Sequence, residues 1–173
     1  EIVTRIFKDF DPLEIKPRHG PGAVATGEKH ERKWNFSTKY ENIHSVYPYY
    51  EYFVPSRGSL IGSKDGTLPS SLSWYKSLKS QDSGVAKVRL VPKDSRGPRL
   101  ISMEPLEYQF VQQGLGRAIV EHLEKKCYIT RGYVNFTDQS INQNLAKWNS
   151  VTGVYATLDM KDASDRVSVT LVG

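Results

Sequence analysis

The sequence has 173 residues, a net charge of +5, 38% hydrophobic residues and one cysteine, Cys127. This length is enough for a buried core, and the composition is typical of a globular domain rather than of a disordered chain. The single cysteine excludes an internal disulfide framework and a cysteine-based zinc site, and no apolar run is long enough to cross a membrane.

The positive charge is concentrated in one segment. Residues 87–99 contain five cations and a single carboxylate, Asp94, and therefore account for +4 of the net +5. Charge focused in this way indicates a polyanionic partner such as nucleic acid or the phosphates of nucleotides. Because the N-terminus has no signal-peptide core and the chain is poor in cysteine, we expect a soluble intracellular protein.

The first ten residues carry apolar side chains at helical spacing, which predicts a short amphipathic helix. A loop of alternating proline and glycine follows over residues 17–23, with Arg18 and His19 at its head. Such a loop lets backbone approach a ligand closely, although the same composition also suits a plain surface connection. No second histidine or carboxylate stands at metal-ligand spacing from His19, so we predict no metal there.

Residues 40–53 are dense in tyrosine and phenylalanine. Aromatic rings near basic residues can stack on unpaired bases, but a tyrosine cluster is more often half-buried core with its hydroxyls at the surface, and we favour that interpretation. Residues 56–83 are rich in serine and glycine and predict a long loop, with Trp74 as a local anchor.

Residues 85–103 predict a β-hairpin, since two alternating arms flank a turn of the composition Pro92-Lys-Asp-Ser-Arg-Gly97. Lys87 and Arg89 share one face of the first arm, because strand side chains repeat every second residue. The turn and the return arm add three more cations: Lys93, Arg96 and Arg99. A stiff hairpin with this charge suits a phosphate clamp, and the alternative is a solvated basic edge strand protected from aggregation.

A helical stripe of apolar residues predicts a scaffold helix from Pro105 to about Lys126. Gly114 and Gly116 within it suggest close packing, and His122 is interpreted as an ordinary surface or boundary residue. The amide-rich segment Asp138-Gln-Ser-Ile-Asn-Gln143 either caps a helix or presents amides to bases and sugars, and its composition favours capping.

Near the end of the chain, Val154–Leu158 has the β-branched and aromatic composition of a buried strand, and residues 166–171 could open a helix. The strand would deliver Asp159 to its carboxyl end, where a carboxylate is well placed to hold a divalent cation. The alternative is that Asp159 merely starts a turn and that Asp162 or Ser164 caps the next helix.

Three motifs, in order, resemble one family, the replicases of leviviruses, which are RNA-dependent RNA polymerase subunits of small single-stranded RNA bacteriophages. Residues 91–105 resemble the basic fingers motif, motif F, and residues 138–143 resemble the amide-rich segment that follows it. Residues 156–165 resemble palm motif A, with its Asp-x5-Asp spacing, and residues 18–23 resemble an upstream fingers loop.

The resemblance implies an α+β chain that forms the fingers and the beginning of the palm of a right-hand polymerase. Residues 1–104 would be a fingers portion that includes the basic hairpin 85–103. Residues 105–173 would be a connecting helix and the start of the palm, with motif A as a strand, turn and helix.

The same resemblance implies roles for single residues. Asp159 would be the catalytic carboxylate that binds magnesium, with the Met160 carbonyl beside it, and Asp165 would select ribose. The incoming triphosphate would be held by Lys93, Arg96 and Arg99. RNA contacts are expected from six further residues: Lys87, Arg89, Arg18, His19, Gln139 and Asn142. Lys161 and Asp162 depart from the small residues expected between the two aspartates.

The implied reaction is template-dependent nucleotidyl transfer, in which two Mg²⁺ ions about 3.5–4 Å apart activate the attacking hydroxyl and stabilise the leaving oxygens. The family's motif B loop and motif C Gly-Asp-Asp turn are absent from this sequence. We therefore expect a fragment, inactive alone, of a longer catalytic chain. The resemblance also implies RNA template and product, nucleoside triphosphates and host translation factors as partners, no membrane, and work in the cytoplasm of a bacterial host.

Two other functions compete with this one. The main alternative is a non-catalytic basic RNA-binding module that uses the 87–99 hairpin, for which Asp159 would be irrelevant. The other is a magnesium-dependent phosphohydrolase built on the Asp159 strand. That enzyme would need an Asp-x-Asp nucleophile pattern, which Asp159-Met-Lys161 does not supply.

Overall fold

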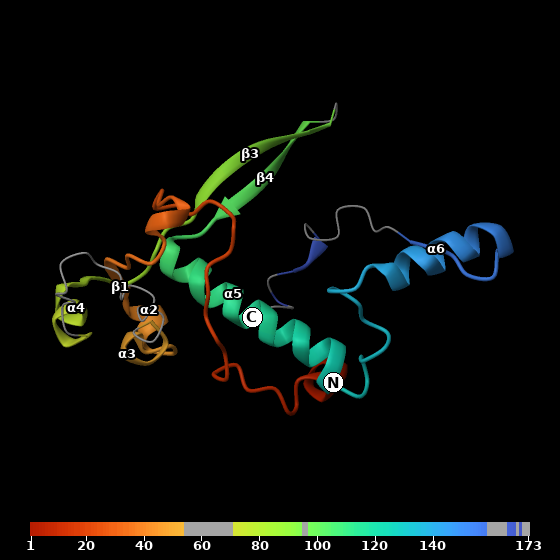
Figure 1. Ribbon diagram of the computed structural model, residues 1–173, viewed down its shortest axis with the longest axis horizontal. Helices are drawn as coiled ribbons and strands as arrows, with labels where there is room; N and C mark the ends of the chain where they lie inside the picture. The colour runs from red at the N-terminus through yellow and green to blue at the C-terminus, as the bar shows by residue number, and fades with distance from the viewer. Residues whose placement is uncertain (54–70, 95–96, 159–165, 169, 171–173) are drawn as a thin grey trace.

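One long helix, α5 (Leu106–Glu121), runs through the middle of the molecule and organises the rest (Figure 1). The structure is a computed structural model, and it describes residues 1–53, 71–94, 97–158, 166–168 and 170. The helix begins after Pro105, whose extended backbone forms its N-cap. The apolar stripe of the helix faces the core, where Leu106, Phe110 and Val111 are buried. The predicted scaffold helix is therefore confirmed.

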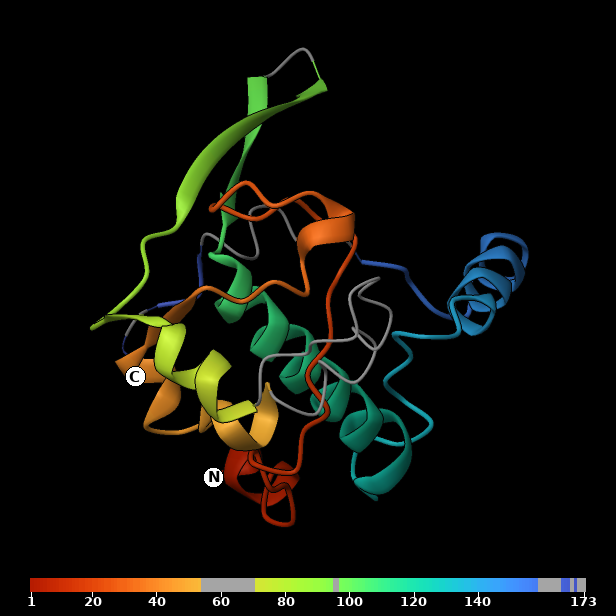
Figure 2. The ribbon, with the colours of Figure 1, turned by 60° about the vertical axis from the view of Figure 1, so that its left-hand side comes forward.

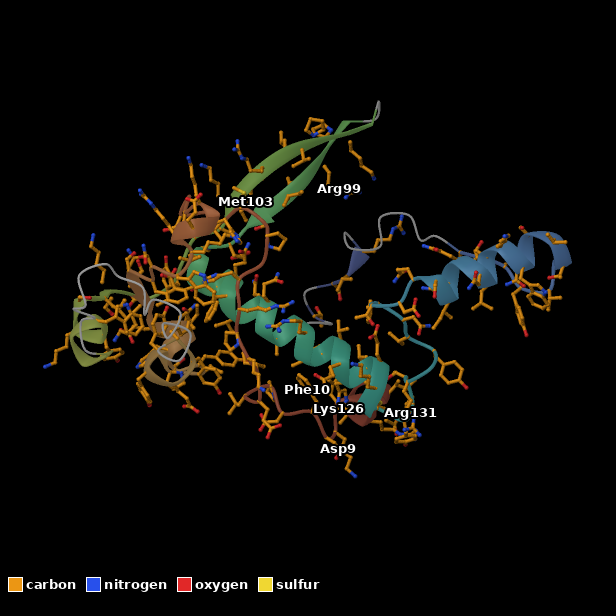
Figure 3. The ribbon with its side chains drawn as sticks, in the orientation of Figure 1. Asp9, Phe10, Arg99, Met103, Lys126 and Arg131 are labelled. Carbon is orange, nitrogen blue, oxygen red and sulfur yellow. The ribbon has the colours of Figure 1, made fainter. Side chains whose placement is uncertain are left out.

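The helix passes at its far end into a single π-helical turn, η3 (His122–Lys126), and the N-terminal helix α1 (Ile2–Ile6) lies beside it. The ring of His122 is buried and packs against Phe7 and Phe10, with centroids 5.8 and 5.3 Å away, and its Nε2 lies 2.7 Å from the Ile6 carbonyl oxygen. Figure 3 shows Phe10 at this end of the molecule. His122 is thus a core residue, and its interpretation as a surface or boundary residue was wrong.

The opposite flank of α5 carries two short parallel strands and small helices (Figures 1 and 2). The strands are β1 (Thr38–Tyr40) and β2 (Lys79–Gln81), and the helices are η1 (His30–Arg32), α2 (Glu41–His44), α3 (Tyr49–Tyr52) and α4 (Ser71–Ser77). Because α4 and β2 lie within residues 56–83, the prediction of one long loop there was wrong for the described part. Residues 54–70 lie outside the described residues.

The core of this flank is aromatic, as predicted. Tyr40, Tyr49 and Phe53 are buried with Phe36 and Phe110, and the rings of Tyr49 and Phe53 stack with centroids 4.0 Å apart. The half-buried tyrosines of the same segment place their hydroxyls at the surface: the Tyr47 hydroxyl donates to the Pro12 carbonyl and the Tyr52 hydroxyl to the Leu13 carbonyl. Trp74 is buried and donates from Nε1 to the Phe36 carbonyl at 3.3 Å, which confirms its anchoring role.

The predicted hairpin is present as the antiparallel pair β3 (Lys87–Asp94) and β4 (Gly97–Met103), and it projects from the N-terminal end of α5 (Figures 1 and 2). Cations alternate with apolar residues along the first arm, the return arm is mostly apolar, and Gly97, at φ +130°, permits the return after the turn. Residues 95–96, which include Arg96, lie outside the described residues.

The C-terminal part carries α6 (Ser140–Thr152), which stands apart from α5 in both views. Its N-cap is Gln139, whose side chain makes no capping hydrogen bond, and Gly153 ends it with φ 66°. Asp138, one residue before the N-cap, accepts from the Ser140 amide at 3.0 Å. The segment therefore does begin a helix, but the prediction that Asp138 is its cap was wrong by one residue.

The buried strand predicted over Val154–Leu158 is not formed. Val154, Tyr155 and Leu158 are 57, 65 and 89% exposed, and in the described part of the chain no strand pairs with this segment. A strand is stable only beside a partner, and composition alone does not supply one. Residues 159–165 lie outside the described residues, as do 169 and 171 within the helix expected at 166–171. The described residues 166–168 form no α-helix, so the expected helix does not begin at Arg166.

The described residues thus combine helices with two small sheets, in keeping with an α+β composition. α5 shares one core with residues that all precede it in sequence, from Ile15 to Trp74. The division into fingers (1–104) and connecting helix with palm (105–173) stays a prediction. Among the helices that the structure describes, none is long and apolar enough to cross a membrane.

Candidate nucleic-acid interface

The pairing register of the hairpin gathers cations on one of its faces. Lys87 pairs with Met103, Arg89 with Ile101 and Val91 with Arg99, and directly opposite residues of an antiparallel pair share a face. Lys87, Arg89 and Arg99 are all exposed, and none of them forms an ion pair with another residue that the structure describes. Their charge is therefore available to an anionic ligand.

The other face of the hairpin is apolar. Val88 and Leu90 alternate with the cations, and Leu100 pairs with Leu90, so these three side chains share a face. They are 58, 64 and 65% exposed, respectively. The described cations of the paired arms therefore share one face with Val91, Ile101 and Met103, whereas the other face carries no charged residue.

The clamp predicted for a triphosphate lies toward the tip of the hairpin. Lys93 is exposed and sits where the register shifts between Val91 and Asp94, a β-bulge that re-aims side chains next to the turn. Arg99 lies nearer the tip of the hairpin than Met103, which ends β4 at the base (Figure 3). Arg96, the third member, lies outside the described residues.

A pocket of about 620 Å³ lies between the base of the hairpin and the first turns of α5. Its lining includes the cationic face of β3 and β4, the backbone of the 17–23 loop and a row of glutamines on α5. The lining residues are Gly22, Ala23, Arg89, Leu90, Val91, Pro92, Ile101, Ser102, Met103, Glu104, Gln109, Gln112 and Gln113.

The 17–23 loop approaches α5 closely, and glycines make this possible. A Cβ at Gly114 would lie 2.8 Å from the Cα of Pro17, and a Cβ at Gly20 would lie 3.0 Å from the Gln113 side chain. At this crossing the Arg18 amide donates to the Phe110 carbonyl at 3.3 Å. The close packing expected at Gly114 is confirmed, whereas Gly116 faces open space.

Lys33 anchors the same loop to α5 through hydrogen bonds. Its side chain is 3% exposed, and its Nζ donates to the Gly20 carbonyl at 2.8 Å, the Gly22 carbonyl at 2.5 Å and Gln109 Oε1 at 3.1 Å. Burial lowers the pKa of Lys33, yet three acceptors satisfy all three of its donors. Gln109 completes the network by donating from Nε2 to the Ala23 carbonyl at 3.3 Å.

His19 is half-buried, and its ring packs against the aromatic core. Its ring sits among Trp34, Phe36 and Phe110, with centroids 4.5, 5.5 and 4.7 Å away. Both ring nitrogens are buried without a hydrogen-bond partner among the described residues. Burial, with the nearby charges of Lys33 and His30, lowers the pKa of His19 to about 4. The neighbouring Arg18 is exposed.

The amides predicted to contact RNA on α6 do not join this interface. Gln139 donates from Nε2 to the carbonyls of Asn135 and Phe136, and its Oε1 accepts from Asn142 Nδ2 at 3.4 Å. These bonds stabilise the start of α6, which lies away from the hairpin in Figures 1 and 2.

The predicted catalytic residues Asp159, Met160 and Asp165 lie outside the described residues. Within the part of the chain that the structure describes, no group of three or more histidine, cysteine, aspartate or glutamate side chains is placed to hold a metal ion. The described residues therefore provide the basic and amide-bearing part of the interface.

Sequence reasoning missed Lys33, Gln112 and Gln113. Lys33 stands in a polar stretch where burial has no local signal, because its acceptors are backbone carbonyls of a distant loop. The two glutamines did carry a signal. Gln112 falls on the side of the helix away from Leu106 and Phe110, whereas Gln113 stands seven residues after Leu106 at the edge of the apolar stripe, and both lie in the helix that follows the basic hairpin.

Comparison with known proteins identifies relatives of this chain. The family model described as RNA replicase, beta-chain, matches residues 35–173. The chain is 34% identical to the RNA-directed RNA polymerase subunit beta of Qbeta virus (strain MX1) over 113 residues, which are 60% of this chain and 18% of that protein. It is 38% identical to the RNA-directed RNA polymerase beta chain of Escherichia phage MS2 over 82 residues, which are 47% of this chain and 14% of that protein.

The aligned region spans less than a fifth of the length of these curated relatives. No solved structure matches the chain. The family match covers the hairpin, α5, α6 and the segment from 154 onward, and thus most of the elements described above. The chain belongs to the RNA replicase beta-chain family.

Proposed function

We propose that this chain contributes the fingers and the entry to the palm of a template-dependent RNA polymerase that copies a bacteriophage genome. Family membership supports the activity, since the relatives are named RNA-directed RNA polymerase subunits. The observation that carries the proposal is the register of the hairpin, which holds Lys87, Arg89 and Arg99 on one exposed face. In this proposal the partners are RNA and nucleoside triphosphates, and the work takes place in the cytoplasm of the host.

The clamp would act on the incoming nucleotide through charge. Negative charge builds on the β- and γ-phosphates as pyrophosphate leaves, and fixed cations stabilise that charge without reorganisation. Lys93 and Arg99 emerge from two antiparallel strands, so the fold holds their backbones together, and Arg96 lies between them in sequence. The planar fork of arginine suits phosphate oxygens.

The acidic part of the proposed site is Asp159, the Met160 carbonyl and Asp165. The carboxylate and the carbonyl are hard oxygen donors, the class that magnesium prefers, and these two would hold the ion. When bound, two Mg²⁺ ions would supply activation of the attacking hydroxyl and stabilisation of the leaving oxygens. Asp165 would accept a hydrogen bond from the ribose 2′-hydroxyl and so distinguish ribose from deoxyribose.

The test uses the complete replicase chain and primer-extension kinetics. Lys93→Ala and Arg99→Ala should each raise KM for nucleoside triphosphate about tenfold, the value of one lost charge-assisted hydrogen bond of about 1.4 kcal/mol. Arg131→Ala, an exposed arginine far from the hairpin, is the matched control and should leave KM unchanged. Asp159→Ala should abolish synthesis. Retained synthesis by that variant would reject the catalytic assignment.

A non-catalytic RNA-binding module remains the second candidate, because the described cations form an exposed, unpaired face without reference to Asp159. It predicts salt-sensitive RNA binding with no role for that aspartate. The two candidates therefore separate on one variant: Asp159→Ala removes synthesis if the chain is part of a polymerase and changes nothing if it is only a binding module.

A further inference from the structure

The pocket at the base of the hairpin differs in chemistry from the clamp near its tip. Its volume of about 620 Å³ lies within the range of sites that hold small ligands. Val91, Ile101 and Met103 supply apolar surface from the hairpin, and Gln112 and Gln113 supply amides from α5. A nucleobase needs this combination, since its face is apolar and its edge carries donors and acceptors.

The amides of Gln112 and Gln113 are free to bind a ligand. Both residues are exposed, and neither side-chain amide hydrogen-bonds another group in the part of the chain that the structure describes. Gln109 differs, because both ends of its amide are taken by Lys33 and the Ala23 carbonyl. The helix thus presents two unused amides beside one that is structural.

The floor of the pocket is held rigidly. Lys33 ties the Gly20 and Gly22 carbonyls to Gln109, and the Ala25 amide donates to the Glu104 carbonyl at 2.8 Å. The loop, the end of β4 and the start of α5 are therefore cross-linked. A preorganised pocket binds without first ordering its own loop.

A cation stands at the edge of the same pocket. Arg89 lines it and shares a face with Lys87 and Arg99, which continue the positive charge on either side. A row of cations beside a base-sized pocket matches a polynucleotide strand, whose phosphates recur along its length, better than it matches a single free nucleotide.

We propose that this pocket binds one unpaired base of a single-stranded RNA, with the base face against Val91, Ile101 and Met103, the base edge on Gln112 and Gln113, and the adjoining phosphate on Arg89. Glutamine amides hydrogen-bond base edges, and unstacked bases of single strands are the usual targets of sequence-reading contacts in RNA. The inference rests on the proposed use of RNA by this chain and adds a base-binding site beside the triphosphate clamp, since Val91 of the pocket pairs with Arg99 of the clamp.

The test measures binding of this chain to a fluorescent single-stranded oligoribonucleotide and to a set of the same oligomers that are abasic at one position in turn. Gln112→Ala/Gln113→Ala should weaken binding of the intact oligomer about tenfold. One abasic position should cause a similar loss, and the double variant should lose nothing more on that oligomer. This non-additivity identifies a base contact, because a merely structural effect would weaken both oligomers alike.

Gln81→Ala, an exposed glutamine on β2, is the matched control and should bind as the unmodified chain does. A free nucleoside triphosphate should compete with the oligoribonucleotide equally well for the unmodified chain and for the Gln112→Ala/Gln113→Ala variant. Competition that depends on Gln112 and Gln113 would assign the pocket to free nucleotide and overturn the inference.

Two further outcomes separate the inference from the proposed function. If neither the abasic positions nor the glutamine variant changes the affinity for RNA, the base pocket is overturned. That result leaves the polymerase assignment intact. Loss of synthesis in Asp159→Ala, measured separately in the complete chain, decides that assignment whatever the pocket binds.

Discussion

The ammonium nitrogen of Lys33 lies 3.1 Å from the side-chain oxygen of Gln109, a residue 76 positions further along the chain. The same ammonium holds two carbonyls of the 17–23 loop, at Gly20 and Gly22. A buried cation with three neutral acceptors is therefore the join between the loop and α5. Its removal leaves those acceptors without a donor.

Lys33→Met keeps an unbranched apolar side chain of nearly the same length and removes the charge and the donors. We expect a loss of about 3 kcal/mol in the free energy of unfolding, because hydrogen bonds to charged groups contribute about 1.5–3 kcal/mol and the orphaned Gly20 carbonyl stays buried. Urea unfolding of this chain measures the loss. Lys29→Met, at an exposed lysine nearby, should change stability by less than about 0.5 kcal/mol, and an equal loss in the two variants would contradict the role given to Lys33.

Gly114→Ala and Gly116→Ala form a matched pair on α5. The new Cβ at 114 would meet the Pro17 backbone at 2.8 Å, so we expect destabilisation of about 2 kcal/mol from overpacking. The same methyl at 116 meets nothing within 4 Å and should raise stability by up to about 1 kcal/mol, since alanine favours the helix over glycine. Thermal unfolding should shift in opposite directions, and shifts of the same sign would refute the close crossing.

Two titratable groups, the buried Glu107 and the half-buried His19, should give opposite pH dependences. Burial raises the pKa of Glu107 to about 7, and burial, with Lys33 and His30, lowers the pKa of His19 to about 4. Between pH 4.5 and 6.5 the native chain binds more protons at Glu107 than the unfolded chain does, so this group makes stability fall as pH rises. At His19 the unfolded chain binds more protons, so stability rises with pH.

Replacing either group should leave the pH dependence of stability that the other group causes. Glu107→Gln should make stability rise with pH between 4.5 and 6.5 relative to the unmodified chain. His19→Phe, which keeps an aromatic ring in the cluster, should make stability fall with pH over the same range. Each change is at most about 1.4 kcal/mol per pH unit. Urea unfolding at several pH values checks both, and identical pH profiles for all three chains would rule out the shifts.

The hairpin cations should set the salt dependence of RNA binding. Arg89→Ala and Lys87→Ala should each weaken binding to single-stranded RNA and reduce the slope of log Kobs against log salt by about 0.7, because each removes one phosphate contact. Titrations at 50 to 200 mM salt provide the slope. Arg131→Ala removes the same charge at an exposed site away from the hairpin and serves as the control. If Arg131→Ala reduced the salt slope and the two hairpin variants did not, the RNA would bind elsewhere.

The sequence predicted the elements that depend on local signals. Alternation and turn residues sufficed for the hairpin, and the apolar stripe sufficed for α5. It did not predict the contacts that join distant segments, such as Lys33 with Gly22 or His19 with Phe110. The strand at 154–158 was wrong for the same reason, since apolar composition resembles a strand whether or not a partner lies beside it.

The candidate site divides in the same way. The basic face of the hairpin follows from residue spacing, because strand parity assigns Lys87 and Arg89 to one side. The pocket below it required the fold, since the hairpin, the 17–23 loop and α5 meet there. The acidic residues at 159–165 stay predictions drawn from the resemblance and from family membership.

The crossing of the 17–23 loop over Gly114 has a consequence for genetics. The Arg18 amide reaches the Phe110 carbonyl only because no side chain stands at 114, and the same loop carries the Gly22 backbone that lines the pocket. A selection for replicase mutants with weakened RNA binding should therefore recover substitutions at Gly114 and Lys33. Neither residue lines the pocket, so we expect that second substitutions in the 17–23 loop can restore RNA binding in such mutants. Arg89 itself lines the pocket, so loop substitutions should not restore binding when Arg89 is replaced.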